Sequence, residues 1–117
     1  MTEDRKPASP HAIADKAEVA IDFPDKFYMG GFGRDCAFEA RADADGVAIR
    51  LIRSGDDRRV AEIHLHHLLF ADILEEIARS LAGRAAVDTT HREPLLKAAQ
   101  NLAAALQKTD ILPATAG

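Results

Sequence analysis

The feature that most constrains the fold is a change of hydrophobic period at His67. Between residues 35 and 66, apolar and polar residues alternate, as in strands that bury one face. The segments 35–42, 47–54 and 58–67 show this alternation, and their inward sets are Cys36, Phe38, Ala40; Val47, Ile49, Leu51; and Ala61, Ile63, Leu65. After His67 the period becomes 3.6, the period of an amphipathic helix. The sequence therefore predicts strands followed by helix.

Short polar turns separate the three alternating segments. Residues 43–46 read "DADG" and residues 55–58 read "GDDR". Glycine and aspartate favour tight reversals between neighbouring strands. We expect the three strands to form an antiparallel meander.

Two helices are predicted after the meander. The first has an apolar stripe that should cover one face of the sheet, and Gly83 is well placed to end it; the stripe consists of Phe70, Ile73, Leu74, Ile77 and Leu81. The second should begin near Thr90 or Glu93, where Thr-x-x-Glu resembles a capping box and Pro94 suits a first turn. Its apolar seam is formed by Leu95, Ala99, Leu102 and Leu106.

The segment before the meander is less regular. "EVAIDF" at residues 18–23 reads as extended, and "KFYMGGF" at 26–32 reads as a strand in which Gly30 and Gly31 predict a bulge or sharp bend. We predict a flexible arm over residues 1–17, one domain over 18–108 and a flexible tail over 109–117. The expected fold class is α+β, an antiparallel β-meander of three to four strands followed by two α-helices.

Composition limits the functions available to the chain. The 117 residues carry a net charge of −4, which argues against a general polyanion binder, because that affinity depends on basic side chains. One cysteine provides no internal disulfide and favours a reducing, intracellular setting. No apolar run is long enough to span a bilayer, and the N-terminus lacks the apolar core of a signal peptide. We expect a cytoplasmic protein without membrane association.

The order of strands and helix resembles the repeat of the PUR-alpha family and, at the level of the fold, the Whirly and positive-cofactor-four single-strand binders. The resemblance covers about residues 26–82 and is carried by these residues: Phe38, Glu39, Arg41, Gly46, Ile49, Arg50, Leu51, Arg58, Arg59, Ile63, Leu65, Phe70 and Leu74. It implies binding of single-stranded DNA or RNA on the sheet. It also implies a homodimer, because such repeats pair into an intertwined unit.

The chain departs from the family at the turn after the first motif strand. The family has a basic turn there, whereas this chain reads "ADADGV", with Asp43 and Asp45 in place of cations. Residues 34–66 contain six arginines and seven acidic residues, so the meander carries no net positive charge. The chain can therefore have the fold that the resemblance implies without binding nucleic acid.

Three interpretations are open for the outer sheet face, which carries Glu39, Arg41, Arg50, Ile52, Glu62, His64 and His66. Its arginines and histidines can bind phosphates and bases. They can equally belong to a solvated face of cross-strand ion pairs, each contributing a few tenths of a kcal/mol. In the third interpretation a second subunit covers the face.

Metal and catalytic interpretations find little support. His64 and His66 share a strand face, but a metal site normally needs three or more ligands, and His67 fits a role at the strand-to-helix junction. The glycines at 30, 31 and 33 lack the spacing of a phosphate-binding loop, and Cys36 is expected in the core, where thiols are usually inert. We predict no catalytic residues, no metal and no cofactor.

The leading functional hypothesis is a non-enzymatic, PUR-like single-stranded nucleic-acid-binding or regulatory module acting as a homodimer. The predicted binding residues are Lys26, Tyr28, Phe32, Arg34, Arg41, Arg50, Arg53 and Arg59. The alternative is a protein-interaction or accessory subunit without nucleic-acid binding. In that case the sheet face and the second helix would dock a protein partner.

Overall fold

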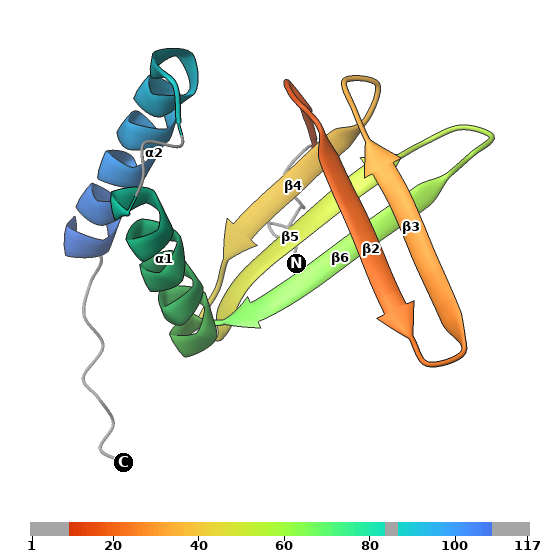
Figure 1. Ribbon diagram of the computed structural model, residues 1–117, viewed down its shortest axis with the longest axis horizontal. Helices are drawn as coiled ribbons and strands as arrows, with labels where there is room; N and C mark the ends of the chain where they lie inside the picture. The colour runs from red at the N-terminus through yellow and green to blue at the C-terminus, as the bar shows by residue number, and fades with distance from the viewer. Residues whose placement is uncertain (1–9, 84–86, 109–117) are drawn as a thin grey trace, which may run out of the picture. The chain divides into compact units, whose positions relative to one another are not determined.

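The computed structural model describes residues 10–83 and 87–108, and the chain divides into two compact units between Leu74 and Glu75. Six strands lie in the first unit (Figure 1): β1 (His11–Ala12), β2 (Ala17–Phe23), β3 (Lys26–Phe32), β4 (Ala37–Ala42), β5 (Gly46–Arg53) and β6 (Arg59–His66). Helix α1 (His67–Ala82) begins in the first unit and ends in the second, which also contains α2 (Thr89–Lys108). The predicted α+β class, with an antiparallel meander followed by two helices, is confirmed.

The meander forms a four-stranded antiparallel sheet in the order β1-β4-β5-β6. The β4–β5 turn is closed by Asp43, whose carboxylate accepts hydrogen bonds from the backbone N–H groups of Asp45 (2.8 Å) and Gly46 (3.0 Å). The β5–β6 turn contains Gly55 at a φ of 99°, a conformation that favours glycine. Both turns therefore lie where the sequence predicted them.

Strands β2 and β3 form a separate two-stranded sheet. Pairing runs without interruption from Ala17 opposite Phe32 to Phe23 opposite Lys26, and Pro24 and Asp25 make the turn. The predicted bulge at Gly30 and Gly31 is therefore wrong. Both glycines are paired, Gly30 with Val19 and Gly31 with Glu18.

The small core lies between this hairpin and the four-stranded sheet. Its buried side chains are Ile13, Phe32 and Cys36, and the partly buried side chains packed against them are Ala17, Val19, Phe38, Leu51 and Ala61. The sheet face that we expected a helix to cover is thus covered by the hairpin. Ile63, predicted to point inward, is 50% exposed.

The helices end and begin at identifiable residues. Gly83 follows α1, as predicted, and its N–H donates to the Arg79 carbonyl at 3.2 Å. At the start of α2, Asp88 is the N-cap, since its carboxylate accepts from the backbone N–H of His91 at 3.0 Å. The predicted capping box of Thr90 and Glu93 is therefore wrong, and Pro94 lies inside the helix.

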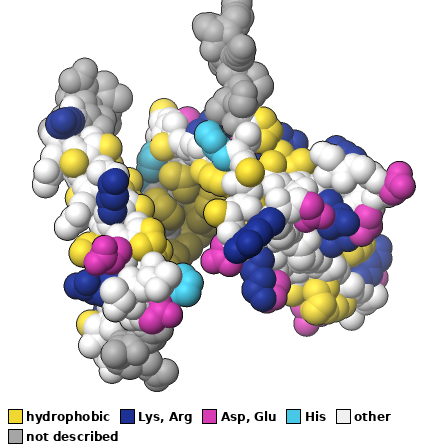
Figure 2. All heavy atoms as spheres, turned by 90° about the horizontal axis from the view of Figure 1, so that it is seen from above, with side chains coloured by type: hydrophobic (Ala, Val, Ile, Leu, Met, Phe, Trp, Pro, Cys, Tyr) yellow, Lys and Arg dark blue, Asp and Glu magenta, His cyan; other side chains and the backbone are white. Residues whose placement is uncertain are grey.

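None of the described residues of α1 or α2 is buried. Apolar side chains reach the surface in both units, among interspersed basic and acidic ones (Figure 2). Among the described helices, none has the length and hydropathy needed to cross a membrane.

The ordered part of the chain begins earlier than the predicted domain limits place it. Of the predicted arm, residues 1–9 lie outside the described residues, but His11 and Ala12 form β1 and Ile13 is buried, so ordered structure begins before residue 17. The predicted domain of residues 18–108 spans both compact units. The predicted tail, 109–117, lies outside the described residues.

Candidate functional site: a groove between the hairpin and strand β6

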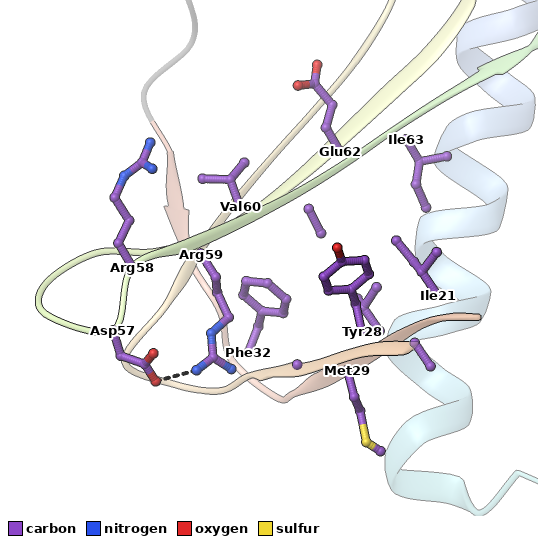
Figure 3. A pocket seen from close by; sticks show the side chains of 14 residues that line it. Ile21, Tyr28, Met29, Phe32, Asp57, Arg58, Arg59, Val60, Glu62 and Ile63 are labelled. Atoms are coloured by element: carbon purple, nitrogen blue, oxygen red, sulfur yellow. Dashed lines mark hydrogen bonds and ion pairs between the residues drawn. The ribbon is translucent and has the colours of Figure 1, made fainter. Parts of the chain in front are cut away.

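A groove of about 770 Å³ lies between the β2–β3 hairpin and β6. It is lined mainly by apolar residues, with charged residues at the β5–β6 turn and on β6: Val19, Ala20, Ile21, Tyr28, Met29, Gly30, Phe32, Asp57, Arg58, Arg59, Val60, Ala61, Glu62 and Ile63. Figure 3 shows the side chains of Ile21, Tyr28, Phe32 and Ile63 in the space between hairpin and strand, whereas Arg58 and Glu62 point away. An apolar groove of this kind suits an apolar side chain or strand more than a phosphate.

Arg59 connects the two sides of the groove. Its Nη1 donates a hydrogen bond to the Gly31 carbonyl at 3.3 Å, and its guanidinium also pairs with Asp57. The side chain passes over Gly30, where an added Cβ would lie 3.3 Å from Arg59 Cδ. Because glycine has no side chain, Gly30 leaves room for the Arg59 side chain to reach the hairpin.

Most of the predicted phosphate-binding arginines are engaged by protein groups. Arg50 lies 3.4 Å from Glu39 and 3.7 Å from Glu62. Arg53 lies 3.2 Å from Asp35, and Arg34 Nε donates to the Ala14 carbonyl at 3.3 Å. The Arg50 contacts match the interpretation of cross-strand ion pairs on the outer sheet face, whereas Arg34, Arg53 and Arg59 are engaged elsewhere.

The remaining predicted binding residues differ in accessibility. Phe32 is 3% exposed and belongs to the core, so it cannot stack on a base without leaving the core. Tyr28 is 52% exposed and makes an edge-on contact with Phe23, their ring centroids 6.1 Å apart. Among the described residues, Lys26 and Arg41 have no carboxylate within ion-pair distance.

The acidic turn of the meander is tied to the start of α1. His67 Nε2 lies 3.0 Å from the Asp43 carbonyl oxygen, and the His67 N–H donates to the Asp45 carbonyl at 3.3 Å. The backbone hydrogen bonds from Asp45 and Gly46 lower the pKa of Asp43, and the nearby His64 and Arg41 add to the effect. The acidic turn thus has a structural role, and His67 lies at the strand-to-helix junction, as predicted.

The histidines of β6 lie close together without completing a metal site. The rings of His64 and His66 are 5.0 Å apart, and His64 Nε2 is 4.0 Å from Asp43 Oδ1. The described part of the chain contains no group of three or more histidine, cysteine or acidic residues arranged to hold an ion.

No protein-family model, curated protein or solved structure matches this chain. The PUR-like resemblance therefore stays a prediction, and functional inference rests on the groove and on the surfaces around it.

Several residues that line the groove lie outside the predicted binding set. Among them are Ile21, Arg58 and Val60, which come together because the hairpin forms a second layer over the sheet. A signal was present: Pro24-Asp25 lies between two extended segments, and proline and aspartate favour a tight turn. No local pattern, however, places a hairpin across β6.

Proposed function

We propose that this chain is a non-catalytic protein-interaction module that works as a homodimer. The observation that carries the proposal is the imbalance between buried and exposed apolar side chains. Among the described residues, three apolar side chains are buried, whereas fifteen large ones are exposed. Exposed apolar side chains in this number are typical of proteins that bury them in interfaces.

The fifteen exposed apolar side chains lie either on the hairpin and groove or on the two helices. Those of the hairpin and groove are Ile21, Phe23, Phe27, Tyr28, Met29 and Ile63. Those of the helices are Leu68, Leu69, Leu74, Ile77 and Leu81 on α1 and Leu95, Leu96, Leu102 and Leu106 on α2. Full burial of one large apolar side chain contributes roughly 1.5–3 kcal/mol. A dimer that covers several of them gains free energy that the monomer lacks.

Urea unfolding at two protein concentrations tests the proposal. Because a dimer is favoured by mass action, its midpoint should rise between about 1 μM and 100 μM protein. A midpoint independent of concentration would contradict the homodimer. The m-value gives a second readout, since it increases with the surface exposed on unfolding.

A second candidate, PUR-like single-stranded nucleic-acid binding by the same module, is favoured by one group of residues. Tyr28 is half exposed on β3, and Lys26 on the same strand has no carboxylate partner among the described residues. An accessible aromatic ring near an uncompensated cation suits base stacking next to a phosphate. The paired arginines and the buried Phe32 favour the interaction module over this candidate.

Titration with short single-stranded DNA and RNA at low and moderate salt tests this second candidate. Binding should be strongest at low salt and should weaken in Lys26→Gln but not in Lys97→Gln, a matched change on α2. Absence of binding at low salt removes the nucleic-acid function.

A further inference from the structure

Strand β6 is an edge strand. In the described sheet it pairs with β5 on one side, and its other side has no partner strand. An eight-residue edge with an exposed isoleucine is a template for pairing with another chain. We propose that two copies of this protein join through antiparallel pairing of β6 with the partner's β6, with Ile63 on the two-fold axis. This inference rests on the proposed homodimer and names its interface.

The hydrogen bond at the β4–β5 turn fixes which backbone groups are free. The Asp43 N–H donates to the Gly46 carbonyl at 2.8 Å, so even-numbered residues of β5 face β4 and odd-numbered ones face β6. Odd residues of β5 lie opposite odd residues of β6, such as Ile49 opposite Ile63. The residues of β6 whose backbone N–H and C=O groups face the open edge are therefore Val60, Glu62, His64 and His66.

Two symmetric β6 strands can pair in few registers. Residues whose backbone groups face the open edge must lie opposite such residues of the partner. If Glu62 lies opposite the partner's Glu62, two like charges meet. If His64 lies opposite the partner's His64, the pairing within β6 shortens to residues 62–66. If Ile63 lies opposite the partner's Ile63, the seven residues 60–66 of each strand pair. Glu62 of each chain then lies opposite the partner's His64.

Charge and hydrophobicity both favour the register centred on Ile63. Glu62, whose carboxylate also lies 3.7 Å from Arg50, is opposite the partner's His64, whose imidazole can donate it a hydrogen bond. Ile63, half exposed in the single chain, meets its own copy at the axis, where side chains of a non-hydrogen-bonded pair lie closest.

The hairpin gives the incoming strand an apolar cover. In Figure 1 the β2–β3 hairpin crosses β6, and its turn lies beyond the outer edge of that strand. Ile21 and Tyr28 line the groove on this side, together with Ile63. A strand added to β6 would therefore lie beneath the hairpin, with its own Ile63 and Leu65 side chains toward these residues.

The two hairpins can occupy the same face of the joined sheet. Each crosses its own β6 near residues 59–63, which line the groove and are centred on Ala61. In the register centred on Ile63, Ala61 lies opposite the partner's Leu65, so the two crossing points are about four residues, or roughly 13 Å, apart along the strands. That separation leaves room for two two-stranded ribbons side by side.

Cysteine cross-linking of the full chain tests this register. Ile63→Cys in a Cys36→Ala background should give a band at twice the 12.7 kDa chain mass under mild oxidation, reversed by a thiol reductant. The expected Cα–Cα distance of about 4.5 Å in such a pair lies within the range of disulfides. Leu65→Cys is the matched control and should stay monomeric on the gel. A mixture of Ala61→Cys and Leu65→Cys should cross-link.

The urea and cross-linking results together distinguish failure of the β6 interface from failure of the homodimer. If the urea midpoint rises with concentration but Ile63→Cys cross-links no better than Leu65→Cys, the interface is elsewhere and the inference is overturned. If the midpoint does not change, both proposals fail. If Cys36→Ala does not fold, Ile63→Cys is made in the native background, where peptide mapping must find the bond between the two introduced cysteines.

Discussion

The side chain of Arg59 lies over the backbone of Gly30 and donates a hydrogen bond to the Gly31 carbonyl at 3.3 Å. This contact joins the two sheets of the first unit, because Arg59 opens β6 and the glycines belong to β3. It also explains the glycine at position 30 of this aromatic stretch. Gly30 is not the site of a bulge but the place where the long Arg59 side chain crosses β3.

Gly30→Val should destabilise the protein, because a branched side chain would occupy the space of Arg59. We expect a loss of about 1–3 kcal/mol in the free energy of unfolding, as for overpacking elsewhere. Gly31→Val is the matched control: a Cβ there lies 3.9 Å from the Ala17 carbonyl, an ordinary contact. Chemical denaturation compares the two, and equal losses would show that Arg59 does not hold the hairpin.

Gly46→Ala should cost on the order of 3 kcal/mol or more, because the added methyl group would overlap backbone. A Cβ at this position would lie 2.0 Å from the Leu65 carbonyl oxygen. The β5–β6 ladder would have to shift to admit it. Thermal denaturation followed by circular dichroism measures the effect, and a native-like midpoint would contradict the close pairing of Gly46 with His66.

Acid should weaken the protein partly through Asp43. Backbone hydrogen bonds from Asp45 and Gly46 depress the pKa of Asp43 in the folded state below its ordinary value of 3.8. A depressed pKa stabilises the fold above that ordinary value, and the contribution is lost as the pH falls through the folded pKa. Asp43→Asn should therefore be less stable than the native chain at pH 7, with the difference shrinking below pH 3.8.

Urea unfolding across this pH range measures that difference directly. Asp45→Asn is the control, since the backbone N–H of Asp45, not its carboxylate, bonds Asp43. A constant gap between the native chain and Asp43→Asn from pH 7 to pH 3 would contradict the role of the charge.

Asp88→Ala should shorten or fray α2, because the N-cap carboxylate accepts from the His91 N–H at 3.0 Å and also lies 2.7 Å from His91 Nδ1. The helical circular dichroism signal should fall. Glu93→Ala removes the acidic residue of the capping box that the sequence suggested, and it should leave the signal nearly unchanged. A larger loss of helical signal in Glu93→Ala than in Asp88→Ala would support the capping box instead.

The sequence predicted the elements whose pattern is local. Alternation located β4, β5 and β6, the stripe from Phe70 to Leu81 located α1, and Gly83 marked its end. These signals are strong because each strand or helix carries its own periodicity. The PUR-like resemblance and the nucleic-acid residues stay predictions.

The features that the sequence did not predict depend on contacts between distant segments. Ile13 is buried because β1 pairs with β4, which no pattern within residues 1–17 indicates. Ile63 alternates like a core residue, yet it is half exposed because the hairpin and β6 leave a groove beside it. Its exposure is explained if a second chain completes the packing.

The mass of the protein in solution tests the central claim most directly. Sedimentation equilibrium at micromolar concentration should report twice the 12.7 kDa mass of one chain. On dilution the dimer should dissociate into single chains. No species larger than the dimer should form, because an interface with two-fold symmetry is closed. A mass of one chain throughout the micromolar range would contradict the proposal that the exposed apolar surfaces are buried against a second copy.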